Sequence, residues 1–306
     1  MIKEMMVNKK ILVDDALECL LMPLDPAHDS LYASMQYSLM AGGKRIRPCL
    51  FLVLLDILGV DSNLYINVAC ALECVHTYSL IHDDLPGMDN DDYRRGKLAN
   101  HKKYGVGIAT MAGDGLLTYA FELLACENNI SFFKRIALIK ILTAAAGPAG
   151  MVGGQAHDKG AEGKTLSLSE LMFLDQCKTG KLICASLDMA SEIAGLSKND
   201  KEAIHTYGKH IGLLFQITDD LLDFNGVFQE MGKVPLQDIS EHKCTYVTLL
   251  GKHQAQQRAR KEAVAAVQSL GAFGEEFKPL RELPEMILCQ SKKRTTGCSF
   301  GRTRFF

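Results

Sequence analysis

The amino-acid sequence predicts an all-α fold, and three observations support this prediction. Apolar residues recur at helical spacing, with Ser, Gly and Pro standing where helices begin and end. No hairpin dipeptide separates two alternating runs, so strand signals are nearly absent. Apolar residues make up 47% of the 306 residues, which is enough for a sizeable core without disulfides or metals.

The first predicted helices lie on either side of a glycine pair. A helix over residues 31–40 ends at Gly42-Gly43, and Pro48 stands in the first turn of the next helix. The segments 49–60 and 136–146 are apolar on almost every side. We therefore expect both of these helices to be central.

Two later helices carry capping signals. Ser167 and Glu170 form a predicted capping box before a helix that Gly195 ends. Asn199 and Glu202 repeat this spacing before a long helix. These signals indicate that the helical pattern continues through the second half of the chain.

The composition changes only near the end of the chain. The long helix is expected to end at Gly226, and residues 1–288 are interpreted as a single domain. Residues 289–306 contain five basic residues, no acid and no helical period. We expect this tail to be disordered or atypical.

Composition also excludes several classes of protein. The formal net charge of −2 argues against a general nucleic-acid binder. The ten cysteines form no C-x-x-C pair, which is typical of buried thiols in a reducing compartment. The longest apolar run, Cys49 to Val60, contains Asp56 and is shorter than the ~20 residues of a membrane span. We therefore expect a cytoplasmic protein with no membrane span and no leader.

One acidic motif lies within the long predicted helix. Asp219 and Asp223 are four residues apart and share a helix face, while Asp220 lies about 100° around the axis. Like charges at this spacing destabilise an isolated helix, so a cation is expected over them. The flanking residues are mostly apolar, which is unusual for a solvated acidic face.

An earlier acidic motif has a different spacing. Asp83 and Asp84 precede Pro86-Gly87, and Asp89 follows. On an ideal helix Asp83 and Asp89 would point to nearly opposite sides. Because Pro and Gly both break helix geometry, we expect the chain to bulge until Asp89 returns beside Asp83.

Paired carboxylates suit a hard cation. Mg²⁺ is commonly shared between one or two carboxylates and substrate phosphates, so the two motifs together predict several Mg²⁺ ions on one diphosphate. An EF-hand fits poorly because the first motif lacks its third ligand and its glycine position. Two solvated acidic turns are the remaining alternative.

Basic residues gather near these motifs and before one helix. Each alone could be an ordinary surface residue, but together they provide charge for two diphosphates. The candidates are Lys44, Arg47, Arg94, Arg95, Lys178, Lys233 and Lys243.

Six segments resemble the trans-isoprenyl diphosphate synthases, especially bacterial farnesyl and plant-type geranylgeranyl diphosphate synthases. They are GGKRIRP, ECVHTYSLIHDDLPGMDNDDYRRGK, AGDGLL, GMVGGQ, KTG and FQITDDLLD, spread over roughly residues 25–285. The resemblance implies an all-α isoprenoid synthase fold with helices around a deep cavity, and a homodimer. It also implies about three Mg²⁺ ions that bind with substrate.

The resemblance assigns a role to each matching position. It implies that Asp83, Asp89 and Asp219 bind Mg²⁺, with Asp84, Asp220 and Asp223 in support. Arg94, Lys178, Lys233 and Lys243 would contact the allylic diphosphate, and Lys44, Arg47, His76 and Arg95 would bind isopentenyl diphosphate. Thr179 and Gln216 would present oxygens to the developing carbocation, and Phe215 would cover the alkene.

The same family suggests what sets product length. Tyr78 and Ser79 lie one helical turn before Asp83, where a bulky residue blocks elongation in this family. Tyr78 therefore favours a C15 product, farnesyl diphosphate, although ordinary core packing is an alternative.

Three other functions remain open. They are a geranylgeranyl diphosphate synthase, a terpene cyclase and a non-catalytic partner subunit. A cyclase would not need the isopentenyl diphosphate site, and a partner subunit usually lacks one acidic motif.

Overall fold

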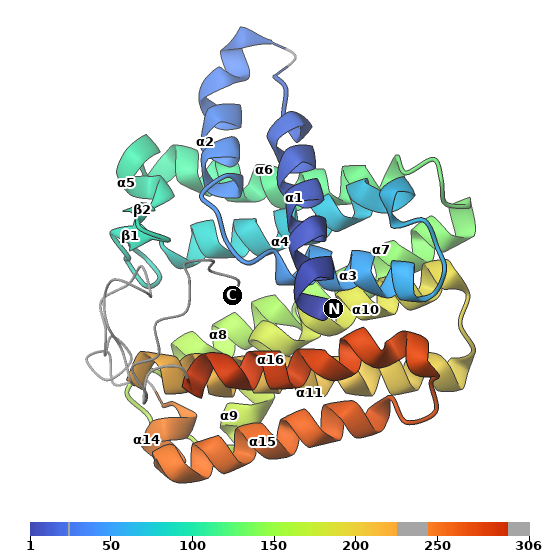
Figure 1. Ribbon diagram of the computed structural model, residues 1–306. Helices are drawn as coiled ribbons and strands as arrows, with labels where there is room; N and C mark the ends of the chain where they lie inside the picture. Colours follow the sequence, from blue (N-terminus) through green and yellow to red (C-terminus); the bar gives the residue numbers. More distant parts are fainter. Residues whose placement is uncertain (24, 225–243, 293–306) are drawn as a thin grey trace. The chain divides into compact units, whose positions relative to one another are not determined.

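The computed structural model describes residues 1–23, 25–224 and 244–292, and most of them lie in helices (Figure 1). Two compact units are distinguished, Met6–Lys140 in one and Met1–Met5 with Ile141–Phe306 in the other. The helices that begin before residue 140 are α1 (Ile2–Leu20), α2 (Asp29–Leu39), α3 (Ile46–Ile57), α4 (Ile66–Asp83), α5 (Asn100–Tyr104), α6 (Val106–Ala125) and α7 (Phe132–Ala146), with short 3₁₀ turns η1 (Pro26–His28) and η2 (Ser62–Tyr65).

The later helices follow the same plan. They are α8 (Met151–Ala161), α9 (Leu168–Asp175), the π-helical turn η3 (Gln176–Gly180), α10 (Lys181–Ala194), α11 (Lys198–Phe224), α14 (Tyr246–Leu250), α15 (Lys252–Ser269), the 3₁₀ turn η4 (Glu275–Phe277) and α16 (Lys278–Lys292). The predicted all-α class is confirmed.

In the unit Met6–Lys140, α4 packs along α6, and α3 also contacts α4. Every residue of α3 from Pro48 to Leu55 is buried, so the prediction that segment 49–60 is central is confirmed for this part. Helix α4 is also largely buried, and its C-terminal end carries the first acidic motif. The core therefore fixes the position at which that motif begins.

In the other unit, α11 is the central helix. It contacts α10, α15 and α16, and Figure 1 shows α11, α15 and α16 side by side in yellow, orange and red. The capping box at Ser167 and Glu170 is formed as predicted, and Gly195 ends α10 with φ 72°. The predicted cap at Asn199 is wrong, because the Ser197 hydroxyl accepts the Asp200 N–H instead (3.2 Å).

One expectation about the central helices needs correction. The segment 136–146 is not central: its helix α7 exposes Ile136 at 38%, and the preceding Phe132 and Phe133 at 68% and 85%. Apolar residues occur on more sides of α7 than the neighbouring helices bury.

A short hairpin was also missed. Strand β1 (Tyr93–Arg94) pairs antiparallel with β2 (Lys97–Leu98). The turn residues Arg95 and Gly96 have φ 54° and 75°, as a type I′ turn requires. The strands are only two residues long, too short for an alternating pattern.

The C-terminal end of the described chain is helical. Helix α16 continues to Lys292, so the first four residues of the predicted tail, 289–292, are helical rather than irregular. The expected helix end at Gly226 lies outside the described residues, as does the rest of the tail.

Two helical stretches are long and apolar enough to cross a membrane by length and composition. They are Ser62–Asp83, whose apolar window is 61% buried, and Phe132–Ala161, whose window is 33% buried. This is weak evidence for a membrane span, because core helices of globular proteins pass the same test. Both stretches contain polar residues, so neither is an unbroken apolar run.

Candidate active site

The first acidic motif folds back on itself. Helix α4 ends at Asp83, and the backbone N–H of Asp89 donates to the carbonyl of Asp83 (2.8 Å). The turn between them is closed by the Met88 N–H donating to the Leu85 carbonyl (2.8 Å). The expected return of Asp89 to Asp83 is therefore confirmed in the backbone.

Asp84, the second carboxylate of this motif, is paired with Arg94. The Arg94 Nε donates to both oxygens of Asp84 (2.9 and 3.2 Å), and Arg94 Nη2 also contacts Asp84 and Asp91. Burial alone would lower the pKa of Arg94, but the hydrogen bond to Asp84 and the charges of Asp84, Asp91 and Asp83 together outweigh it, so the pKa is raised. Asp84 and Arg94, predicted to serve metal and phosphate respectively, thus bind each other.

The hairpin also places Arg95 against the glycine pair. Arg95 Nη1 donates to the Gly42 carbonyl, and a Cβ on Gly43 would lie 2.6 Å from the guanidinium carbon. Gly43 also has φ 128°, which an L side chain rarely adopts. The glycine pair therefore lets the loop before α3 and the hairpin approach closely.

Two further predicted residues lie near Arg95. Burial and then Arg95 lower the pKa of Arg47 to about 10, with Glu73 acting in the opposite direction. Burial, followed by Arg47 and Arg95, holds the pKa of His76 well below its usual range. Arg47, His76 and Arg95, three of the predicted binding residues for isopentenyl diphosphate, therefore cluster in one unit. Lys44, the fourth, is exposed on the loop before α3.

The second acidic motif is anchored within α11. Gln216 Nε2 donates to Asp220 Oδ1 (3.0 Å), and the backbone N–H of Tyr246 donates to Asp220 Oδ2 (2.9 Å). Asp220 and Asp223 are 6% and 8% exposed, whereas Asp219 is exposed. Asp219 and Asp223 lie one turn apart in α11, as predicted, but Asp223 is buried and Asp219 is exposed.

The π-helical turn η3 brings the predicted catalytic residues together. The Thr179 hydroxyl donates to Gln216 Oε1 (3.4 Å). A Cβ on Gly212 would lie 2.7 Å from the Gly180 Cα, so α11 packs with its backbone against the turn. Because Gly212 and Gln216 are one helical turn apart, this contact aligns Gln216 with Thr179. Phe215, one residue before, is half-buried.

Helix α8 contacts the other part of η3. A Cβ on Gly154 would lie 2.5 Å from the backbone nitrogen of Lys178. One turn later on α8, Asp158 Oδ2 lies 2.6 Å from Lys178 Nζ. Lys178 is therefore held by a carboxylate that the sequence did not identify, although the Gly154–Asp158 spacing in GGQAHD is a detectable signal.

The predicted chain-length residues lie on α4. Tyr78 is 5% exposed, and its ring meets His82 edge-on at 5.7 Å between centroids. Burial, then Asp83, raises the pKa of Tyr78 to about 12. Ser79 donates to the His76 carbonyl (2.9 Å). Tyr78 thus lies close to the first acidic motif.

Glu73 is another residue that sequence reasoning did not identify. It lies three residues before His76 on α4, is 1% exposed and contacts Arg45. A buried acid in an apolar helix was the available signal. Lys233 and Lys243, both predicted to contact phosphate, lie outside the described residues.

The donor chemistry fits Mg²⁺ that arrives with phosphate. Among residues 1–23, 25–224 and 244–292 no group of three metal-binding side chains is preformed. Mg²⁺ usually keeps several waters and takes only one or two carboxylates, with phosphate completing the shell. The folded-back Asp83–Asp89 segment supplies carboxylates of this type.

Comparison with known proteins identifies the class and then the family. The fold is that of the all-α isoprenoid synthases, since a geranyltransferase from Helicobacter pylori, solved with magnesium and isoprenyl diphosphate, superposes with a TM-score of 0.84. It shares 34% identity, and the match covers 95% of this chain and 98% of that one. The polyprenyl synthetase model matches residues 28–277, and this chain belongs to that family.

Two relatives illustrate the range within the family. The farnesyl diphosphate synthase of Geobacillus stearothermophilus is 48% identical over 242 residues, which cover 78% of this chain and 82% of the relative. The geranylgeranyl diphosphate synthase of Cyanophora paradoxa is 38% identical over 283 residues, covering 92% and 94%.

Proposed function

We propose that this protein is a short-chain trans-prenyltransferase that condenses isopentenyl diphosphate with dimethylallyl or geranyl diphosphate and releases farnesyl diphosphate. The observation that carries the proposal is the cluster of Arg47, His76 and Arg95 in the unit whose acidic motif folds Asp89 back to Asp83. Cations and carboxylates in one site suit a substrate that presents a diphosphate with its metal.

The acidic residues would hold Mg²⁺ together with the allylic diphosphate. Mg²⁺ held by these residues would neutralise the negative charge that develops on the departing diphosphate. Asp83, Asp89 and Asp219 are the proposed ligands, supported by Asp84, Asp220 and Asp223. About three ions, bound only with substrate, are proposed.

Two groups of side chains are proposed to act on the allylic substrate. Lys178 and Lys233, with Arg94 and Lys243, bind the diphosphate as the allylic C–O bond breaks and the electron pair goes to its oxygen. Thr179 and Gln216 direct oxygens to the resulting carbocation. The long hydrogen bond between them, 3.4 Å, keeps the two oxygens side by side before substrate arrives.

The second substrate supplies the electrons for the new bond. Lys44, Arg47, His76 and Arg95 bind isopentenyl diphosphate, and Phe215 covers its alkene. The alkene attacks the allylic carbon and forms the new C–C bond, which leaves a carbocation on the isopentenyl unit. The carbon next to this cation loses a proton to the departing diphosphate, and a double bond is restored. Apolar walls exclude water that would quench the cation.

Tyr78 favours a C15 product over a C20 product. Its buried ring lies one turn before Asp83, in line with a role as a stop below the first motif. Geranylgeranyl diphosphate synthases among the relatives make a C20 product the second candidate.

We further propose a cytoplasmic homodimer that binds neither nucleic acid nor membrane. Phe132 and Phe133 at the start of α7 are 68% and 85% exposed, which is unusual for large apolar side chains and suits a contact with a second copy. Sedimentation analysis of the purified protein would measure this state, and a monomer would contradict it.

The function is tested with radiolabelled isopentenyl diphosphate, an allylic diphosphate and Mg²⁺, followed by sizing of the products. We expect C15 as the main product from either starter, with no product when a chelator replaces Mg²⁺. Incubation with geranyl diphosphate alone is the control for a cyclase. Cyclised product there, or no incorporation of label, would contradict the proposal.

A further inference from the structure

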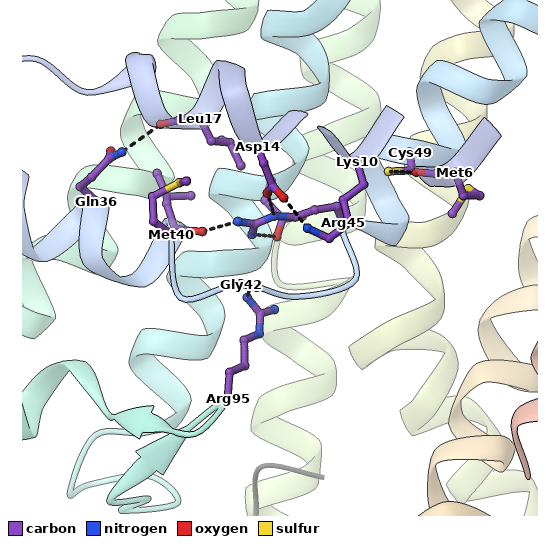
Figure 2. A network of polar contacts seen from close by, with 12 residues as sticks. Met6, Lys10, Asp14, Leu17, Gln36, Met40, Gly42, Arg45, Cys49 and Arg95 are labelled. Atoms are coloured by element: carbon purple, nitrogen blue, oxygen red, sulfur yellow. Dashed lines mark hydrogen bonds and ion pairs between the residues drawn. The ribbon is translucent and has the colours of Figure 1, made fainter. Parts of the chain in front are cut away.

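The last residue before α3, Arg45, forms a buried ion pair with Glu73 of α4. Arg45 has φ 49° at the N-terminus of α3, and its side chain is fully buried. Its Nη1 lies 2.6 Å from Glu73 Oε1, its Nε lies 2.8 Å from Asp14 Oδ1, and its Nη2 donates to the Leu39 carbonyl. Figure 2 shows Arg45 beside Asp14, with Arg95 pointing toward Gly42. Each of the three guanidinium nitrogens therefore has a partner.

Two other cations near Glu73 lack such a partner. In the part of the chain that the structure describes, no ion pair joins Arg47 or Arg95 to a carboxylate, and the buried Nε of Arg47 has no hydrogen-bond partner. Glu73 is close enough to raise the pKa of both arginines, while burial lowers it. One carboxylate therefore stands among three guanidinium groups and contacts only Arg45.

This distribution of charge has a functional consequence. A buried carboxylate needs a paired cation, and a guanidinium drawn into such a buried pair has fewer donors and less net positive charge for an incoming phosphate than a partly exposed ammonium does. If Glu73 bound Arg47 or Arg95, it would compete with a diphosphate for the same donors. Arg45 prevents this by forming the ion pair with Glu73 itself.

We propose that Arg45 is a positioning residue that binds Glu73 and so keeps Arg47 and Arg95 available for the diphosphate of isopentenyl diphosphate. The inference rests on the proposed function, because it assigns the anion site to that substrate. Arg45 itself contacts no substrate. Its effect is to define which of the neighbouring cations remain unpaired.

The first test replaces Arg45 by methionine, which fills similar volume without charge. In R45M, Glu73 loses its partner, and Arg47 and Arg95 are the neighbouring cations that can take its place. We expect KM for isopentenyl diphosphate to rise about tenfold, with KM for geranyl diphosphate changing less than about twofold. Adding E73Q removes the released carboxylate, so R45M/E73Q should recover to within about threefold of the wild-type KM.

Two controls separate charge release from loss of structure. Lys10→Met removes another cation that contacts Asp14 but leaves the Arg45–Glu73 pair intact, so both KM values should stay unchanged. Circular dichroism and thermal melts establish that each variant is folded. If R45M does not fold, E73Q alone decides, and we expect its KM for isopentenyl diphosphate to stay within about twofold.

Several results would overturn the proposal. They are an equal KM in R45M and wild type, no recovery in the folded double variant, a parallel rise of both KM values, or a tenfold rise in E73Q. Failure of the proposed function is distinguishable, because wild-type protein would then incorporate no isopentenyl diphosphate at all.

Discussion

Lys178 Nζ lies 2.6 Å from Asp158 Oδ2, so the cation predicted to bind the allylic diphosphate is already held by a carboxylate of α8. Both side chains are 28% exposed, which leaves the ammonium accessible. An ammonium has three donors, and one ion pair leaves the others for phosphate. Asp158 therefore orients Lys178 without blocking it.

Removing this carboxylate charge tests that interpretation. We expect D158N to lower kcat/KM for the allylic diphosphate about tenfold, because a long side chain must then be ordered by substrate alone. KM for isopentenyl diphosphate should change less than about twofold. The matched control is E162Q at the end of α8, where Glu162 pairs with Lys159 at the surface. A rise in kcat/KM of D158N would instead show that Asp158 competes with the diphosphate.

The close packing of α11 on η3 leads to a second prediction. An alanine at Gly212 would place its Cβ 2.7 Å from the Gly180 Cα, so the turn must move. The Thr179–Gln216 hydrogen bond is already 3.4 Å long and should break. We expect G212A to lower kcat about 10- to 100-fold, as small misplacements of catalytic groups do.

Gly160 on α8 provides the matched control for this change. A Cβ there meets no atom within 4 Å. Steady-state kinetics of G160A should match wild type, and its free energy of unfolding should rise by about 0.5–1 kcal/mol through better helix propensity. A G212A variant with wild-type kcat would show that the alignment across η3 does not matter for turnover.

Tyr78 is expected to limit the length of the product. Truncation to alanine removes a buried ring one turn before Asp83 and opens space for a longer chain. We expect Y78A to shift the main product from C15 to C20 or longer, measured by chromatography. Y78F retains the ring and should keep the C15 product. Unchanged C15 output from Y78A would remove Tyr78 from the account.

Asp175, next to η3, should make stability depend on pH. It is 5% exposed, Oδ2 has no hydrogen-bond partner, and burial, assisted by Asp158, raises its pKa from 3.8 to about 7. The folded state therefore holds a proton that the unfolded chain has lost. Stability from this group is lost as pH rises from about 4 to about 7, and the loss is constant above that.

The asparagine variant cannot ionise and escapes this loss. We expect the free energy of unfolding of D175N, relative to wild type, to increase by about 2 kcal/mol between pH 5.5 and pH 8. Urea unfolding at the two pH values measures this difference. An equal difference at both pH values would show that Asp175 titrates normally.

The sequence predicted the parts of the site that depend on local rules. The return of Asp89 to Asp83 followed from Pro86-Gly87, and the Ser167 capping box followed from its spacing. Gly195 at the end of α10 was also predictable, because glycine readily adopts φ 72°. These features involve residues within a few positions of one another.

Features that depend on tertiary contacts were missed. Asp158 meets Lys178 across 20 residues, and Glu73 meets Arg45 across 28. The exposure of α7 was mispredicted because an apolar pattern does not say which side a neighbour covers. Asn199 lost the cap to Ser197, two residues earlier, since both residue types accept the same N–H groups.

The most direct test of the central claim compares D83A and D219A with wild type in the Mg²⁺-dependent condensation of labelled isopentenyl diphosphate with geranyl diphosphate. If both acidic motifs bind Mg²⁺ with the diphosphate, each variant should lose at least about 100-fold in kcat while staying folded. Near-native turnover in either folded variant would contradict the assignment of the two motifs.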